Sequence, residues 1–396
     1  MAASIPALVN PPLLVWAREE AGYSPDEAAE RVRVPVEKLR AWESGDKQPT
    51  LRQAERLAAI YHRPMPVFYL QEPPATLPLS AEYRHLPGVK PGAESPELRL
   101  ALRELHRRRE VALELFEENE EEPPRFNLHA RLHEDPEDVG RRLRKALAVP
   151  LDDQLHWPNE YMAWRTWRDR AEALGLMVFQ VPGIPLREMR GVALFLDPLP
   201  VLGVNSREHP LARAFTLLHE ITHVMLSRSG DEHPAAEERR SASQWSELER
   251  FADATTAAAL MPRETMLADS RIRDHAASAP WDTEEIQALA RRYRVSPVAL
   301  LTRLVNLRRT TWTFYREWRE AWDKQWEQRP KKESAGGPSR VDTILSRVGP
   351  TFAALVLDSL ERDLISPQAA SEALDLKLHH FADLKRELVL GPGGRE

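Results

Sequence analysis

The sequence predicts a mainly α-helical protein of the α+β class, with an N-terminal all-α domain, a central domain that adds a small β-sheet, and a C-terminal helical segment. Three observations predict this. Helix-capping residues punctuate the first part of the chain, the pattern becomes strand-like between 176 and 205, and a flexible linker composition precedes the last helices. With 396 residues the chain is too long for one typical core, so we expect two or three domains.

The composition limits the classes of protein to which this chain can belong. Hydrophobic residues make up 42% and charged residues 29%, which is typical of a globular chain, and no apolar run is long enough for a membrane span. We see no secretion signal, so we expect a cytoplasmic protein with no membrane partner. Because the chain has no cysteine, any metal must be held by histidine and carboxylate. The net charge of -6 gives no whole-chain case for nucleic-acid binding.

Residues 8–70 read as a run of short helices. The stretch "SPDE" at 24–27 supplies Ser24 as N-cap and Glu27 to close a capping box, and "TLRQ" at 50–53 repeats the pattern. Gly45 is expected to end a helix. The expected helices cover about 11–21, 25–32, 36–43 and 51–61.

The rest of the chain divides into four further segments by composition. A connector with one charged helix near 96–118 occupies 71–135, the central domain 136–330, a linker 331–339, and three or four short helices 340–396. Within the central domain the helical patterns lie near 136–147, 158–174, 207–228 and 246–260. The strand patterns, separated by Pro/Gly turns, lie at 176–181, 192–197 and 201–205.

The stretch "HEITH" at 219–223 carries the clearest chemistry. On a helix, His219 and His223 lie on one face and can bind one ion, while Glu220 can take a proton from a zinc-bound water. The alternative is an ordinary buried helix whose polar side chains are satisfied by neighbours. Apolar residues on both sides predict burial, where unpaired polar groups are costly, so we favour zinc. A third ligand must come from another His, Glu or Asp.

Together with "ELERFADATTAAALMP" at 247–262, this motif resembles the ImmA/IrrE family of bacterial metallopeptidases. The resemblance implies that Glu249, rather than Glu247, is the third zinc ligand. Asp253 stands where the family usually has asparagine; it could orient a ligand histidine, or it could be a simple surface charge. Thr222 and Thr255 also depart from the family pattern, and neither departure removes a ligand.

The same resemblance implies a compact zincin fold whose small sheet offers an edge strand to an extended peptide. The implied metal is Zn²⁺, with Mn²⁺ as the alternative, and Glu220 is the implied general base. The implied activity is endopeptidase cleavage of a protein, often a helix-turn-helix repressor, in a stress-response, mobile-element or toxin-antitoxin context. We identify no residue to stabilise the oxyanion; His233 is only a weak candidate.

A competing hypothesis is a transcription regulator or antitoxin-like protein that does not cleave, with a structural or sensory metal domain. Glu220 argues against it, because a structural metal site needs no base.

Residues 11–70 resemble a Cro/C1-type (XRE) helix-turn-helix domain, on the strength of Ala29, Val34 and "LRAWESGDKQPT". The resemblance places the N-terminal part of helix 36–43 in the DNA major groove. The expected phosphate contacts are Lys38, Arg40 and Lys47. However, this segment has nine basic and nine acidic residues, and arginine occupies position 33, where the fold usually has glycine. DNA binding and docking on a protein both remain open.

Two further patterns have structural interpretations. Trp318, Trp322 and Trp326 share one helix face, which more often packs within the protein than binds a partner. Residues 365–384 have a second helix-turn-helix appearance and resemble the C-terminal segment common in such fused proteins. We interpret them as structural, with a partner-binding role as the less favoured alternative.

Overall fold

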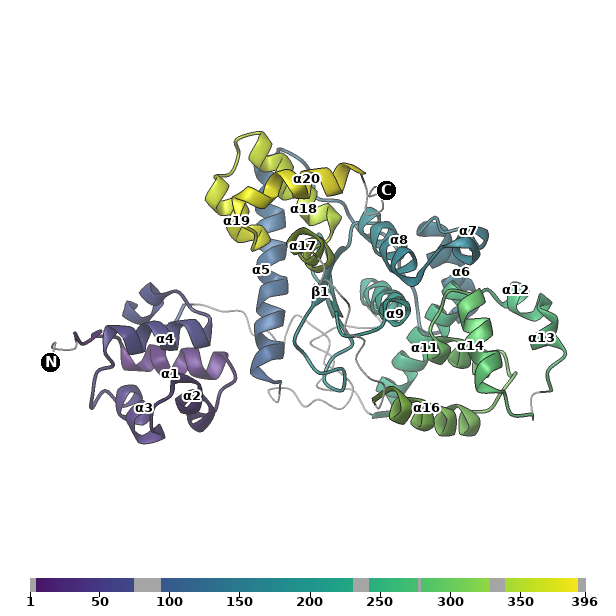
Figure 1. The fold of residues 1–396 in the computed structure, drawn as a ribbon, viewed down its shortest axis with the longest axis horizontal. Coiled ribbons are helices and arrows are strands. Elements are labelled where there is room, and N and C mark those ends of the chain that lie inside the picture. Colours follow the sequence, from purple (N-terminus) through teal and green to yellow (C-terminus); the bar gives the residue numbers. More distant parts are fainter. Residues whose placement is uncertain (1–4, 75–93, 231–241, 277–278, 328–338, 391–396) are drawn as a thin grey trace. The chain divides into compact units, whose positions relative to one another are not determined.

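The computed structural model describes residues 5–74, 94–230, 242–276, 279–327 and 339–390 (Figure 1). The chain forms two compact units. The N-terminal unit contains residues 1–81 and 88–104, and the larger unit contains residues 82–87 and 105–396. Helix α5 (Pro96–Glu118) begins in the first and continues in the second. The protein is mainly helical with one small sheet, as the sequence predicts.

The N-terminal unit is built from four helices and one short 3-10 helix. Both predicted capping boxes form, with Ser24 on Glu27 and Thr50 on Gln53, and the predicted helix bounds hold to within one residue. The elements are α1 (Pro11–Glu20), α2 (Pro25–Val32), α3 (Val36–Glu43), α4 (Leu51–Tyr61) and η1 (Met65–Tyr69).

Two features fix the helix-turn-helix geometry of this unit. Arg33 ends α2 and has a left-handed backbone conformation (φ 64°). Glycine usually occupies this position because it adopts that conformation without strain; here an exposed arginine adopts it. The buried Arg18 side chain donates to Glu43 on α3 at 2.7 Å and to the Tyr23 carbonyl at 3.0 Å. These bonds hold α1 against α3 around an apolar core.

A three-stranded sheet lies at the centre of the larger unit. Its order is β1 (Met177–Val181), β3 (Val201–Asn205), β2 (Gly191–Leu194); β1 is parallel and β2 antiparallel to β3. Every strand residue is buried, because helices cover the sheet. The strand predicted at 192–197 ends early, before Pro198 and Pro200, which cannot donate to a ladder. This leaves β2 as a short edge strand.

Helix α9 (Pro210–Arg228) follows the sheet directly and packs against β2 and β3. It begins three residues later than predicted, because His209 caps it by accepting from the Leu211 amide. Helix α11 (Ala242–Leu260) packs against both α9 and α6. The other helices before the C-terminal segment are α6 (Pro136–Ala146), α7 (Leu151–His156), α8 (Glu160–Ala173), α12 (Arg263–Ala268), α13 (Ser270–Arg273), α14 (Thr283–Arg292), α15 (Pro297–Asn306) and α16 (Trp312–Glu327).

The C-terminal helices pack on the same unit as α9. They are α17 (Arg340–Val348), α18 (Pro350–Glu361), α19 (Pro367–Leu374), η3 (Leu378–His380) and α20 (Phe381–Leu390). Arg168 on α8 donates to the Ser346 carbonyl at 2.6 Å, and Gln180 on β1 donates to the Ser346 hydroxyl at 2.8 Å. These contacts support a structural role for the segment. Of the predicted linker 331–339, only Ser339 lies within the described residues.

Of the tryptophan stripe, Trp318 packs inward, as the structural interpretation expects. Trp318 is buried, stacks on Trp322 with ring centroids 4.9 Å apart, and donates to the Thr283 hydroxyl at 3.1 Å. The side chain of Trp326 lies outside the described residues. Among the described helices, none combines the length and the apolar character that crossing a membrane requires.

Candidate metal centre

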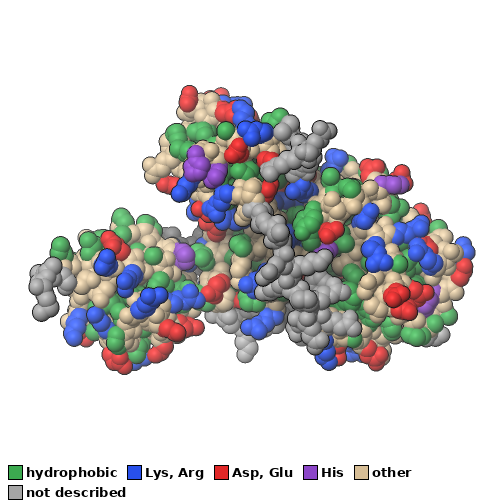
Figure 2. Space-filling view, viewed as in Figure 1, with side chains coloured by type: hydrophobic (Ala, Val, Ile, Leu, Met, Phe, Trp, Pro, Cys, Tyr) green, Lys and Arg blue, Asp and Glu red, His purple; other side chains and the backbone are tan. Residues whose placement is uncertain are grey.

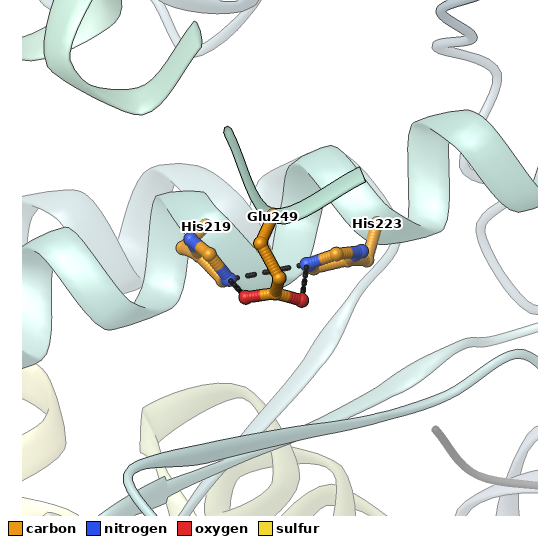
Figure 3. A group of neighbouring side chains, drawn as sticks. All are labelled: His219, His223 and Glu249. Carbon is orange, nitrogen blue, oxygen red and sulfur yellow. Dashed lines mark hydrogen bonds and ion pairs between the residues drawn. The ribbon is translucent and has the colours of Figure 1, made fainter. Parts of the chain in front are cut away.

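Helix α9 places two histidines on one side of its axis (Figure 3). Leu217, Leu218 and Ile221 on the same helix are fully buried in the core, which fixes the rotation of α9. His223 is completely buried and the side chain of His219 is 12% exposed. The burial predicted from the flanking apolar residues is therefore found, and the polar groups of α9 lie where they need partners.

Helix α11 brings Glu249 onto these two histidines (Figure 3). Its Oε2 lies 3.4 Å from Nε2 of His219 and its Oε1 lies 3.5 Å from Nε2 of His223, while the two Nε2 atoms are 3.1 Å apart. Ligands about 2.0–2.1 Å from a tetrahedral zinc are separated from one another by about 3.3 Å. The two histidines and the Glu249 carboxylate therefore converge at separations close to those between the ligands of one zinc ion. Glu247 is exposed and stands outside this group.

Asp253, one turn after Glu249, faces the other nitrogen of His219. Its Oδ1 lies 3.0 Å from Nδ1 of His219, and its own side chain is 43% exposed. Burial lowers the pKa of His219, but the Asp253 and Glu249 carboxylates outweigh it and raise that pKa to about 10. The negative charge around this imidazole favours a positive partner, either a proton or a metal ion.

Glu220 points towards the strand side of α9 rather than into the core. It is 3% exposed, and its side chain lies against Gly191, the first residue of edge strand β2. A Cβ atom at Gly191 would come within 2.6 Å of Oε1 of Glu220. Glycine is therefore required here by close approach. Gly191 was not among the predicted site residues, and its position immediately before a predicted strand was the only signal in the sequence.

The metal group opens into a cleft of about 640 Å³. His219, Glu220, Glu249 and Asp253 line it, whereas the fully buried His223 lies behind them. One wall comes from residues 186–191 and 207–212, and the other from residues 287–299 and helix α16. A cleft of this size beside three metal donors and a carboxylate can admit a peptide segment.

The residues predicted to contact DNA belong to the other unit. Lys38, Arg40 and Lys47 are exposed, and Nζ of Lys38 lies 5.6 Å from the centre of the Trp42 ring. Acidic as well as basic side chains lie on the face of this unit seen in Figure 2. The weak oxyanion candidate, His233, lies outside the described residues.

Comparison with known proteins agrees with this division. A peptidase-family model described as the IrrE N-terminal-like domain matches residues 171–305, which include the sheet, α9 and α11. A helix-turn-helix domain model matches residues 13–66. No curated protein matches the chain.

Proposed function

We propose that this chain, which joins a helix-turn-helix domain to an IrrE N-terminal-like domain, is a zinc-dependent endopeptidase of the ImmA/IrrE type. The observation that carries the proposal is the convergence of His219, His223 and Glu249 at zinc-ligand spacing, beside Glu220 and at the edge of a peptide-sized cleft. The matched peptidase model covers this whole group of residues.

His219, His223 and Glu249 would hold the ion. When bound, Zn²⁺ would supply Lewis acidity to an attacking water and to the carbonyl of the scissile peptide bond. Mn²⁺ is the alternative metal, because the same nitrogen and oxygen donors accept it. The Asp253 carboxylate would hold the Nδ1 proton of His219, which leaves the Nε2 lone pair facing the other donors.

Glu220 would act as the general base. Its carboxylate accepts a proton from the attacking water and transfers it to the nitrogen of the leaving amine. The contact with Gly191 limits the positions that this side chain can adopt. Because the same strand residue begins the edge of the sheet, a peptide that pairs with β2 would pass beside the base.

The finer proposal concerns the substrate. We propose that it is a helix-turn-helix repressor, and that its cleavage changes gene expression. The N-terminal unit would bring the enzyme to DNA through Lys38, Arg40 and Lys47, which are exposed on or just after α3.

Cleavage of candidate repressors by the zinc-loaded protein tests this function. The wild-type protein is expected to cut a repressor at one site, and Glu220→Gln to lose about two to four orders of magnitude in rate while keeping its zinc. Glu247→Gln, an exposed position on α11, is the matched control and should cleave normally. If both wild type and Glu220→Gln leave every repressor intact while the wild type binds an operator tightly, a non-cleaving regulator is the better description.

A further inference from the structure

The cleft is basic outside the metal group. Five arginines line it, from both walls, and only Glu188 and Glu208 accompany them outside the metal group. The arginines are Arg187, Arg190, Arg207, Arg291 and Arg319. Because a protein cleft focuses the field of the charges that line it, this excess of positive charge attracts negatively charged ligands.

Two of the five arginines have partners within the protein. Arg190 forms an ion pair with the buried Glu208 at 2.8 Å, and Arg319 donates to the Tyr315 hydroxyl at 2.8 Å. These two side chains are therefore held by other residues of the cleft lining.

The other three are available to a ligand. Arg187, Arg207 and Arg291 are exposed, and their side chains form no ion pair or hydrogen bond with any residue in the described part of the chain. Arg187 and Arg207 lie on the segments beside β2 and β3, whereas Arg291 lies on α14. A ligand in the cleft can therefore meet free positive charge from both groups of segments.

The space between these arginines is apolar. Its lining includes Phe215 on α9, Val295 just before α15, Val298 on α15 and Trp322 on α16. These side chains form a surface for one apolar group of a ligand. A nucleic acid fits this combination less well than a peptide, because it carries a charge on every phosphate, whereas a peptide can place an uncharged residue beside Glu220, Glu249 and Asp253 and its acidic residues beside the arginines.

We propose that the cleft selects peptide segments in which an apolar residue is flanked by aspartate or glutamate, and that Arg187, Arg207 and Arg291 determine this specificity. The inference rests on the proposed function, because it names the substrate class of that peptidase. Successive side chains of an extended peptide point to opposite sides, so acidic residues at two neighbouring positions beside the apolar one face in opposite directions, towards different parts of the cleft lining. Basic flanks would face like charge and be rejected.

Three matched peptides test the specificity. They share one central apolar residue and differ only in flanks of glutamate, glutamine or lysine. The glutamate peptide is expected to have a kcat/KM about tenfold above the glutamine peptide, with lysine lowest, and the ratio should shrink as salt is added. The variant Arg187→Gln/Arg207→Gln/Arg291→Gln should reduce the preference to about twofold. Arg263→Gln, an exposed arginine on α12 outside the cleft, is the control that should retain it.

A measurement of peptide binding tests this inference independently of the peptidase proposal. Fluorescence anisotropy of the labelled peptides with Glu220→Gln is expected to show the same order of affinity, and the triple variant made in that background should lose it while keeping its zinc and its Tm. Equal cleavage of all three peptides, or equal competition by a short single-stranded oligonucleotide, overturns the acidic-peptide inference and leaves the peptidase standing. Arginine-dependent binding of the glutamate peptide without any cleavage by the wild type supports the specificity and overturns the peptidase.

Discussion

At the scale of single residues, Gly191 is the position where one added carbon should matter most. The Cβ of Gly191→Ala would come within 2.5 Å of Thr216 Cγ2 and 2.6 Å of Glu220 Oε1, both on α9, so the proposed base would have to move. A displacement of about 1 Å can cost about a hundredfold in rate, so we expect kcat to fall by that order while the zinc content stays at one ion per chain. Steady-state kinetics with metal analysis checks this, and a loss of zinc in the variant would contradict it.

Asp253 provides a second test at this scale. The carboxylate lies 3.0 Å from Nδ1 of His219, so its removal in Asp253→Ala should weaken zinc binding by about 10- to 100-fold. Asp253→Asn keeps an oxygen that can accept from Nδ1–H and should lose less. Competition with a coloured chelator measures both. If Asp253→Ala binds zinc as tightly as the wild type, the carboxylate is only a surface charge.

The residues of the site differ in how readily the sequence identifies them. Helix geometry alone places His219 and His223 together, because four residues make about one turn. Glu249 required a family resemblance, since nothing local connects it to α9. Gly191 was not identified because its role depends on which strand crosses the helix. That crossing is a long-range property of the fold.

At the scale of elements, Gly349 joins α17 to α18 at a position where both the backbone conformation and the neighbouring side chains favour glycine. Its φ is 86°, and a Cβ would overlap the guanidinium of Arg168 and come within 2.6 Å of Glu172. Arg168 and Glu172 are both buried, pair at 2.9 Å, and tie α8 to the C-terminal helices through Ser346. We expect Gly349→Ala to lower the free energy of unfolding by about 1–3 kcal/mol.

Thermal unfolding checks this, with Gly183→Ala as the comparison. Gly183 also has a positive φ, of 89°, but a Cβ there would meet nothing within 4 Å. The comparison therefore isolates the overlap with Arg168 from the cost of the backbone conformation. An equal loss of Tm in both variants would mean that the packing of Gly349 contributes nothing.

Element bounds were predictable where local chemistry sets them. The capping boxes at Ser24 and Thr50 fixed the starts of α2 and α4 to the residue. The larger errors arose at α11, which begins four residues before the predicted 246, at α9, which begins three residues after the predicted 207, and at β2, which ends three residues before the predicted 197. The order β1-β3-β2 could not be predicted from strand patterns alone, because it depends on which strands meet in the fold.

At the scale of the whole molecule, the proposed function assigns recognition to the N-terminal unit and catalysis to the larger unit. The N-terminal helices have balanced charge, so DNA binding would rely on a few local contacts. With two or three phosphate contacts from Lys38, Arg40 and Lys47, the logarithm of the binding constant should fall with the logarithm of salt with a slope of about −2 to −3. Anisotropy with a DNA duplex measures this slope. A salt-independent interaction would point to a protein partner instead.

The division into domains was only partly predictable. The proline-rich composition predicts a boundary near residue 70, whereas the N-terminal unit also includes residues 88–104. The sequence could not show that residues 340–390 pack against β1 and α8. The linker composition between 331 and 339 suggested an independent segment. The contacts of the buried Arg168 hold the C-terminal helices on the larger unit. They connect residues far apart in the chain, so the sequence pattern could not show them.

The three-ligand zinc centre is the central claim, and metal analysis of purified variants tests it most directly. Wild type and the exposed control Glu247→Gln should each carry one zinc per chain, whereas Glu249→Ala and His219→Ala should fall well below that after dialysis against a mild chelator. Stoichiometric zinc retained by a well-folded Glu249→Ala variant would contradict the account and place the third ligand elsewhere.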